Sequence, residues 1–389
     1  METNYLFQKR TECCGCEMCA FSCKTGSISI QEDEEGFRYP KIDGSKCIDC
    51  GQCIAACPMR KTTDISSMWL SSYSGWSTSK EIHSTSSSGG FASELAHCFI
   101  ERGGIVYGVA YDERFENAIY IRCKDFNSLQ RLRSSKYIQA QKNEIYSDIL
   151  KDLKSNVSVL FIGTPCDCAA VRFKFGKYSN LFIVSLICHG PTSNEVQKLF
   201  VSKLEQTYKS KTKSFNIRYK KDNQWKPYYI EAQFINGDRY LAPFSYSEYD
   251  NAFRHFKRPS CTSCPFKNDK YAGDLLIGDF HSAKRNTEEY HYMGVSTVLV
   301  TTERGFKLLE ILGTSFDLRK ADLNRSTEQL AVHSSYKMSP VRKQFSLKLR
   351  EEGLTQASNI TYISIDNRMI ELRKMVMKYG SKLKHLIIK

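Results

Sequence analysis

The residues with the clearest chemistry are cysteines, of which this 389-residue chain has 16. Eight of them form two runs of equal spacing, Cys13-x2-Cys16-x2-Cys19-x3-Cys23 and Cys47-x2-Cys50-x2-Cys53-x3-Cys57. The first residues, METNYLFQKR, lack the apolar core and cleavage site of a signal peptide, and no apolar run reaches the length of a membrane span. We therefore expect a cytoplasmic protein without a transmembrane segment, whose clustered thiols stay reduced and bind metal rather than form disulfides.

Both runs resemble the motif of bacterial two-cluster ferredoxins. In that motif three closely spaced thiolates hold three corners of a 4Fe-4S cubane, and the fourth cysteine reaches the other cluster. The resemblance implies one cluster on Cys13, Cys16, Cys19 and Cys57, and a second on Cys47, Cys50, Cys53 and Cys23. Lys24 stands where the motif often has proline, and Cys14 fits neither spacing, so we interpret Cys14 as a non-ligand. Zinc is the alternative metal for such thiols.

A ferredoxin module moves single electrons and does no bond chemistry. A second cofactor in the rest of the chain must then gather electrons into pairs. This requirement indicates a flavin.

The elements that must position these groups follow from hydrophobic patterning. Buried strands are predicted at 105–111, 157–163, 181–187, 274–280 and 295–302, which are rich in Val, Ile and Leu. Helices with apolar residues at three-to-four spacing are predicted at 91–102, 143–154, 193–208 and 305–313. Segments 213–220, 228–235 and 239–245 are typical of consecutive antiparallel strands, with a turn at Asn236-Gly237.

The predicted fold class is mixed α/β (α+β), in four parts. Residues 1–62 form a small ferredoxin-like domain with a hairpin at 27–43, and the Ser-rich residues 63–81 form a surface linker. Residues 82–340 form a larger mixed-sheet domain that binds the flavin. Residues 341–389 form a basic helical C-terminal segment, either a solvated helix docked on the core or a helix for a membrane surface or a partner.

Several segments of the large domain, taken in order, resemble the coenzyme F-420 hydrogenase/dehydrogenase beta-subunit family of flavin and iron-sulfur reductases. They are SSSGGFASEL (86–95), SSKYIQA (134–140), GTPCDCAAVR (163–172), SLICHGPTS (185–193), RPSCTSCPF (258–266), DLLIGDF (274–280) and GVSTVLVTT (294–302). The resemblance extends over roughly residues 1–345.

The resemblance implies FAD as the flavin. Glycines and hydroxyls before a helix suit a phosphate, because backbone amides and the helix dipole favour an anion there. The residues implied to contact FAD are Ser87, Ser88, Gly89, Gly90, Ser135, Lys136, Tyr137, Gly163, Thr164 and Pro165. Without the family context, SSSGG is an ordinary N-cap and SKY an ordinary surface segment.

Four further cysteines, Cys166, Cys188, Cys261 and Cys264, are available for one more site. The family resemblance implies that these four cysteines hold a third 4Fe-4S cluster beside the flavin. Zinc and unligated thiols are the alternatives. Cys166 at a helix N-terminus is also a candidate nucleophile, but no convincing base accompanies it. Cys168, two residues further along a helix, points away from Cys166 and is predicted to pack in the core.

The chain has a net charge of +14, and each bound cubane would offset about two of these positive charges. The basic residues are also dispersed along the sequence, so we do not expect nucleic-acid binding. The predicted function is an oxidoreductase that passes electrons from reduced ferredoxin, or a similar carrier, through clusters to FAD and on to an unidentified small-molecule acceptor, or in reverse. The alternatives are an electron-transfer subunit without its own substrate and a non-catalytic redox sensor. The shared motifs describe cofactors, so the substrate, the use of a deazaflavin and the oligomeric state are left open.

Overall fold

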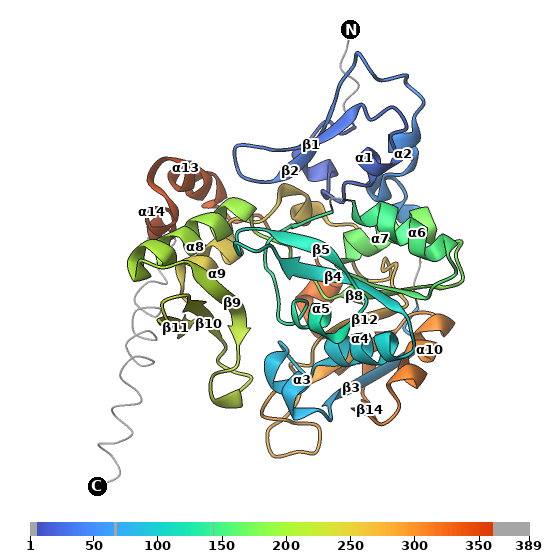
Figure 1. The fold of residues 1–389 in the computed structure, drawn as a ribbon, viewed down its shortest axis with the longest axis vertical. Helices are drawn as coiled ribbons and strands as arrows, with labels where there is room; N and C mark the ends of the chain where they lie inside the picture. Colours follow the sequence, from blue (N-terminus) through green and yellow to red (C-terminus); the bar gives the residue numbers. More distant parts are fainter. Residues whose placement is uncertain (1–5, 66–67, 143, 361–389) are drawn as a thin grey trace.

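The computed structural model describes residues 6–65, 68–142 and 144–360. The cysteine-rich N-terminal part forms a small domain at one end of the molecule (Figure 1). Its hairpin consists of β1 (Ile28–Glu32) and β2 (Arg38–Ile42), which pair antiparallel from Ile28 opposite Ile42. Around the hairpin lie α1 (Met18–Ser22), α2 (Gln52–Ala55) and the 3-10 turns η1 (Arg10–Glu12), η2 (Pro58–Arg60) and η3 (Thr62–Asp64). The predicted hairpin is confirmed.

The large domain contains a mixed sheet of nine strands among the described residues. Its order is β14-β3-β13-β12-β8-β7-β4-β5-β6. The strands are β3 (Ser71–Ser77), β4 (Ile105–Tyr111), β5 (Ala118–Cys123), β6 (Ala140–Gln141), β7 (Val159–Gly163), β8 (Leu181–Leu186), β12 (Leu275–Asp279), β13 (Ser296–Val300) and β14 (Phe316–Lys320). Neighbours β4, β7, β8 and β12 run parallel, and the pairs at the β14 end are antiparallel. The predicted buried strands and the mixed α/β class are confirmed.

Both faces of this sheet are covered, because alternate residues of β7 enter two different cores. Val159 and Phe161 belong to one core with α6 (Ile145–Lys154) and α7 (Pro165–Phe175). Leu160 and Ile162 belong to the other, with α4 (Phe91–Glu101), α5 (Phe126–Gln130) and α10 (Glu303–Leu312). A strand whose neighbours alternate in this way must be apolar throughout, which explains the unbroken run that made it recognisable.

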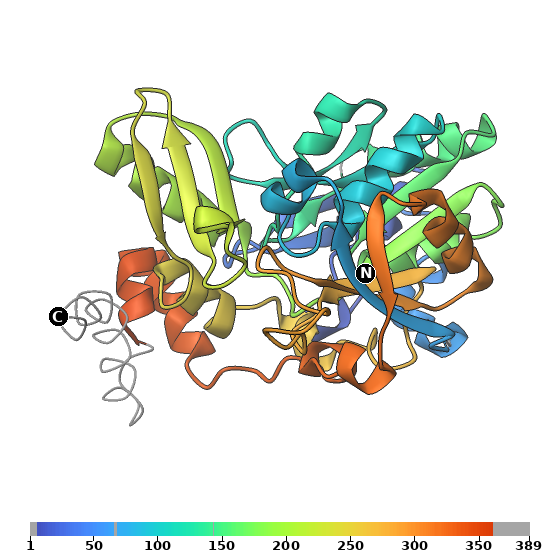
Figure 2. The same ribbon diagram turned by 90° about the horizontal axis from the view of Figure 1, so that it is seen from below.

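A second sheet, in the order β11-β10-β9, lies to one side of the nine-stranded sheet (Figure 2). Its strands are β9 (Thr212–Tyr219), β10 (Tyr229–Phe234) and β11 (Arg239–Pro243), preceded by α8 (Asn194–Tyr208) and followed by α9 (Glu248–His255). The short turn η4 (Lys221–Asn223) precedes β10. The chain turns between β10 and β11 at Asn236-Gly237, as predicted, with φ of 93° at Gly237.

The prediction of a surface linker at 63–81 is wrong for the central part of that segment. β3 lies inside the nine-stranded sheet, paired with β13 and β14 from the far end of the sequence (Figure 2). Its serines are buried, and Ser72 Oγ donates to Ser326 Oγ at 2.6 Å. A side chain at Gly75 would collide with the backbone of Asp317. This strand needs small residues because its neighbours approach closely, and such residues conceal its burial from hydropathy.

The remaining elements close the fold around the sheet edges. They are α3 (Lys80–Thr85), η5 (Pro259–Ser263), α11 (Leu323–Ser326), α12 (Leu330–His333), α13 (Arg342–Glu352) and α14 (Leu354–Asn359). The helical start of the C-terminal segment is thus confirmed, whereas its basic part from 361 on lies outside the described residues. In α13, Arg342 forms an ion pair with Glu35 of the N-terminal hairpin at 2.7 Å. No helix within the described ranges is long and apolar enough to cross a membrane.

Candidate redox centres

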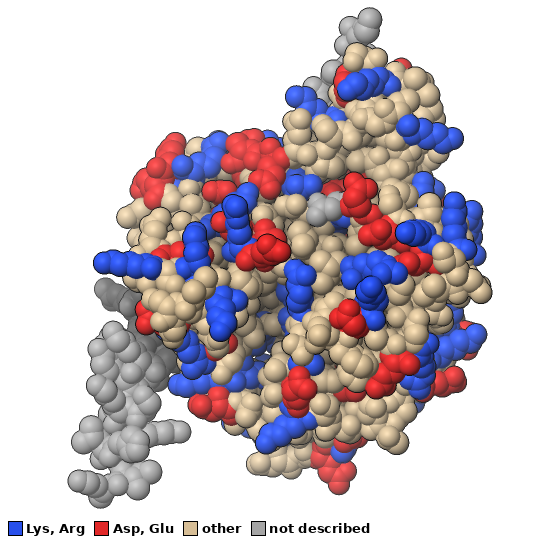
Figure 3. Space-filling model, viewed as in Figure 1, with Lys and Arg blue, Asp and Glu red and all other residues tan. Residues whose placement is uncertain are grey.

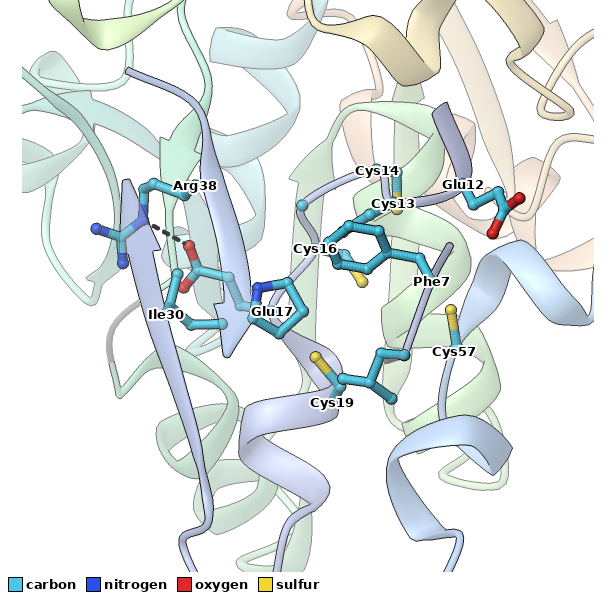
Figure 4. Close-up of a pocket in the computed structure, with 13 residues that line it drawn as sticks. Phe7, Glu12, Cys13, Cys14, Cys16, Glu17, Cys19, Ile30, Arg38 and Cys57 are labelled. Atoms are coloured by element: carbon cyan, nitrogen blue, oxygen red, sulfur yellow. Dashed lines mark hydrogen bonds and ion pairs between the residues drawn. The ribbon is translucent and has the colours of Figure 1, made fainter. Parts of the chain in front are cut away.

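Four of the eight ferredoxin-type cysteines line one hollow of about 450 Å³, which we call the inner site: Cys13, Cys16, Cys19 and Cys57. Figure 4 shows the sulfur atoms of Cys16, Cys19 and Cys57 around a common space, with the Phe7 ring beside it. Glu17, next to Cys16, is fixed by Arg38, whose Nε donates to Glu17 Oε1 at 2.9 Å. Four thiols around one space, drawn from both runs, fit a cubane.

The other four cysteines, Cys23, Cys47, Cys50 and Cys53, line a separate hollow of about 700 Å³, which we call the outer site. Its rim is exposed: Cys50 is exposed, Ile48 has 67% of its surface accessible and Ile54 has 47%. Cys23 Sγ lies 3.1 Å from Ser27 Oγ, and Cys47 Sγ lies 3.7 Å from Asp49 Oδ1. The two hollows therefore divide the cysteines as the crossed ferredoxin pattern requires, although their role as ligands stays a prediction.

The inner site is pressed against the large domain. Three buried side chains of that domain donate to successive carbonyls of the cysteine loop: Gln139 to Cys14, Lys142 to Gly15 and Tyr146 to Cys16, at 2.6–3.3 Å. Gly15 has φ of 71°, and a side chain there would collide with Gln139 and Arg258. This close approach of the two domains requires glycine.

The four remaining candidate ligands, Cys166, Cys188, Cys261 and Cys264, also come together, in what we call the central group. Cys166 is in the first turn of α7, Cys188 follows β8, and Cys261 and Cys264 lie in and just after η5. The thiol of Cys261 is close enough to those of Cys188, Cys264 and Cys166 for all three to raise its pKa, after burial. A side chain at Gly190 would meet Cys261 Sγ at 2.9 Å, so the Cys188 loop packs directly on η5.

Cys14 links the inner site to the central group. It is buried, and its thiol lies close enough to Cys16 of the inner site and to Cys166 of the central group for both to shift its pKa. Cys168, by contrast, turns into the core and lies 3.5 Å from the backbone oxygens of Gly163 and Val184. The predicted division between Cys166 and Cys168 is therefore confirmed in their orientation.

Three thiols of the central group, those of Cys166, Cys261 and Cys264, have raised pKa values and are not activated nucleophiles. The hydrogen bond to Cys14, followed by burial, raises the pKa of Cys166 well above its ordinary value. Burial raises the pKa of Cys264 to about 12. Thiols of this kind are protonated at neutral pH unless a metal replaces the proton. Within the described ranges, no three His, Cys, Asp or Glu side chains are arranged to hold a single metal ion.

The residues predicted to contact FAD divide into two places. Ser87 Oγ lies 3.0 Å from Ser135 Oγ, and the guanidinium of Arg218 donates to Ser87 O at 3.0 Å and to Tyr137 Oη at 3.1 Å. Gly163, Thr164 and Pro165 lie at the central group instead, where Thr164 Oγ1 is 3.3 Å from Cys166 Sγ. Ser88 is fixed by its donation to Val295 O at 2.7 Å, and Gly90 precedes α4 with φ of 87°.

Lys136 is held in a structural position. Its Nζ donates to the backbone oxygens of Arg131, Leu132, Arg133 and Ser134 at 2.8–3.2 Å. Burial, with a smaller contribution from Arg131, lowers its pKa to about 7. The ammonium thus closes the turn that presents Ser135 and Tyr137, and its donors are already engaged.

Two cationic residues missed at the level of sequence lie close to Ser87 and Ser88. Arg218 is buried and pairs with Asp279 at 2.9 Å, and its Nε has no partner among the described residues. Lys220 donates to His83 O and Ser88 O at 2.6 and 2.7 Å, and burial and Arg218 lower its pKa to about 7. In the sequence, the feature that could have indicated these two residues is a pair of positive charges within the predicted strand at 213–220. A buried donor without a partner fits a bound anionic group.

Comparison with known proteins places this arrangement in a family. Residues 157–323 match the family model for the C terminus of the beta subunit of coenzyme F420 hydrogenase/dehydrogenase. The chain belongs to this family. Residues 12–61 match a 4Fe-4S dicluster domain, which covers both cysteine runs. This member of the F420 hydrogenase/dehydrogenase family is therefore an iron-sulfur electron-transfer protein of an oxidoreductase family.

Two individual proteins are similar to parts of the chain. The ketoisovalerate oxidoreductase subunit VorC of Methanothermobacter marburgensis is 35% identical over 60 residues, which are 15% of this chain and 76% of that protein. A chain of the xenon-derivatized F420-reducing NiFe hydrogenase complex from Methanosarcina barkeri is 16% identical, with a TM-score of 0.45, over 76% of this chain and 92% of that chain.

Proposed function

We propose that the chain is an iron-sulfur flavoprotein oxidoreductase. Single electrons enter at the outer site, pass the inner site and the central group, and reach FAD for the two-electron reduction of a small-molecule acceptor, or run in reverse. The observation that carries this proposal is the contact of Cys14 with both Cys16 and Cys166, because it joins the ferredoxin part to the thiols of the large domain. Cys166, Cys188, Cys261 and Cys264 hold the third 4Fe-4S cluster in this proposal.

FAD supplies the exchange between one-electron and two-electron chemistry when bound. The chain's own residues would hold it by the hydroxyls of Ser87 and Ser135, by Tyr137 and by the backbone of Gly89 and Gly90. Arg218 adds a cation beside these groups, and its pairing with Asp279 keeps it oriented. Gly163, Thr164 and Pro165 would then lie where the central group faces the flavin.

The electron carrier, a reduced ferredoxin or similar protein, would dock over the outer site. The exposed Ile48 and Ile54 give that rim an apolar character, and no other candidate cluster site among the described residues is as open. Lys and Arg are interspersed with Asp and Glu on the face shown in Figure 3, so that face offers no continuous basic surface for nucleic acid. The thiols of the described residues are free, as a reducing cytoplasm would keep them.

Counting cofactors tests the core of the proposal. Protein purified without oxygen should contain about twelve irons, matching sulfide and one FAD per chain. The variant Cys264→Ala should lose about four irons and leave about eight, because only the central group is changed. An unchanged iron content in this variant, or about eight irons in the unchanged protein, would contradict the central cluster. Absence of flavin would contradict the FAD site.

Docking at the outer site has its own test. Ile48→Asp should slow reduction by a ferredoxin roughly tenfold, the effect of losing one apolar anchor at an interface. Reduction by dithionite should be unchanged. The matched control is Ile235→Asp, because Ile235 is equally exposed, at 70%, on the turn after β10. Equal effects of the two substitutions would place the docking surface elsewhere.

A second candidate function is an electron-transfer subunit of a larger complex. The relative VorC is named as a subunit, and the matching family model is named for a beta subunit. In that case the isolated chain would accept electrons and reduce artificial dyes, but no small-molecule acceptor would be turned over until a partner chain was added. A screen of acceptors with the isolated, reduced protein separates the two functions.

A further inference from the structure

Arg258 is a buried cation at the junction of the inner site and the central group. Only 1% of its surface is accessible. Its guanidinium donates to Cys13 O and Arg38 O, both at 3.0 Å, and to the side chain of Gln139. The Tyr39 ring lies over it, 4.2 Å from the guanidinium carbon. The backbone of Arg258 leads directly into η5, which carries Cys261.

The guanidinium also reaches a predicted ligand. Nη2 lies 3.7 Å from Cys13 Sγ, within the range of an N–H···S hydrogen bond. The groups whose ionised forms would raise the pKa of Arg258 are the thiol of Cys13, the Tyr39 phenol and the thiols of Cys14 and Cys261, against the larger effect of burial. No carboxylate of the described residues lies within ion-pair distance of it, whereas Arg218 has Asp279 and Lys142 has Asp167. A buried charge needs a partner. The oxygen atoms that accept from this guanidinium are neutral, and the neighbouring groups that a bound cluster would make negative are cysteine sulfurs.

At the outer site the charged side chain beside a cysteine sulfur is acidic. There the acidic Asp49 lies 3.7 Å from Cys47 Sγ, and the other polar contacts are the hydroxyls of Ser27 and Thr25 at Cys23. The surroundings are solvent rather than protein, so charges are screened. Glu12 and Glu17 also line the inner hollow, and Glu17 is paired with Arg38. The two sites, alike in spacing, thus differ in the charged side chain that lies within hydrogen-bond range of a cysteine sulfur, which is Arg258 at the inner site and Asp49 at the outer site.

We propose that Arg258 makes the inner cluster easier to reduce than the outer one, and so directs electrons from the exposed rim toward the central group. The inference rests on the proposed function in assuming that both clusters are present. Reduction adds one electron and one negative charge and breaks no bond. A fixed cation therefore stabilises the reduced form more than the oxidised form, most strongly where water is excluded. Arg258 would act on electron flow through its contact with the candidate ligand Cys13, and it does not contact a substrate.

Potentiometric titration of the holoprotein, followed by electron paramagnetic resonance, tests this inference. The variant Cys50→Ser identifies the outer signal, because Cys50 belongs to the outer site alone. In the unchanged protein the inner signal should have the higher midpoint. In Arg258→Met and Arg258→Gln the inner midpoint potential should fall by at least about 59 mV, which for one electron is a tenfold change in the reduction equilibrium. The outer midpoint should stay where it was.

The matched control is Arg342→Gln, which breaks the ion pair of α13 with Glu35 of the N-terminal hairpin without removing a contact to a cysteine. It should leave both midpoints unchanged. An inner midpoint that does not move in an iron-replete Arg258 variant, or that moves equally in Arg342→Gln, would overturn the inference. If neither Arg258 variant folds, the unchanged protein still decides, since an outer midpoint above the inner one contradicts the proposal. Missing signals or low iron would instead count against the proposed function.

Discussion

The inner and outer cysteine sites have the same spacing and opposite surroundings. Cys16 of the inner site is buried, with the loop around it bonded to Gln139, Lys142 and Tyr146 of the large domain. Cys50 of the outer site is exposed and is flanked by the exposed Ile48. A ferredoxin module is nearly symmetric by sequence, so the asymmetry comes from the domain that it packs against. In the proposed function, that packing would distinguish the end that receives electrons from the end that delivers them.

Removal of a ligand should break the symmetry most strongly. Cys57→Ala and Cys50→Ala should each cost about four irons. Only Cys57→Ala should also destabilise the large domain, because the inner loop then loses three buried hydrogen bonds of about 1 kcal/mol each. We expect its Tm to fall by roughly 5–10 °C. Iron analysis and calorimetry measure both effects, and equal Tm values for the two variants would show that the inner loop does not support the large domain.

Iron loss from the unchanged protein should separate the two sites in time. The outer site is open to solvent at Cys50, whereas at the inner site Cys16 is buried, no cysteine is fully exposed and the loop is held by the large domain. Exposure to a chelator in air should therefore remove about four irons first, roughly tenfold faster than the next four. Arg342→Gln should speed the second phase alone, because it weakens the contact of α13 with the hairpin. A single phase would mean that the burial of the inner site gives no protection.

The two cysteine sites could be predicted from the sequence, but which of them is buried against the large domain could not. The cysteine spacing is local, and a cubane constrains it, so the two groups of four were predictable. The strand β7 was predictable because both of its faces are apolar. Burial of the inner site depends on contacts between residues far apart in the sequence, such as Gln139 with Gly15. Arg258 gave no local signal, and β3 was missed because close packing selects serine and glycine there.

Substitution of Cys14 should sharpen the comparison without disturbing the iron. Cys14 contacts candidate ligands of the inner site and the central group but fits neither spacing. Cys14→Ala should keep about twelve irons and cost about 1 kcal/mol of stability, the value for a small buried group. Electron transfer from the inner site to the central group should slow, as rapid-mixing spectroscopy would show. A loss of about four irons would instead make Cys14 a ligand, and Cys14→Ser then distinguishes ligation from packing.

The smallest expected effect is a pH dependence that acts on the inner site through the large domain. His83 is 1% exposed and its Nε2 lies 2.8 Å from Gly294 O. Burial, followed by the charge of Lys220, lowers its pKa to about 3. Since the unfolded chain binds a proton near pH 6.5 and the folded chain does not, stability is complete above that pH and falls as the pH drops toward about 3.

From about pH 7 to about pH 6 this linkage should cost about 0.7 kcal/mol of stability. His83→Gln should remove that dependence, because glutamine can donate to the same carbonyl without titrating. If the large domain protects the inner cluster, acid in this range should also speed the slow phase of iron loss in the unchanged protein more than in His83→Gln. The fast phase should respond equally to pH in both proteins, because the residues that line the outer site all belong to the N-terminal domain. A slow phase with the same pH dependence in both would separate the protection of the inner cluster from the stability of the fold.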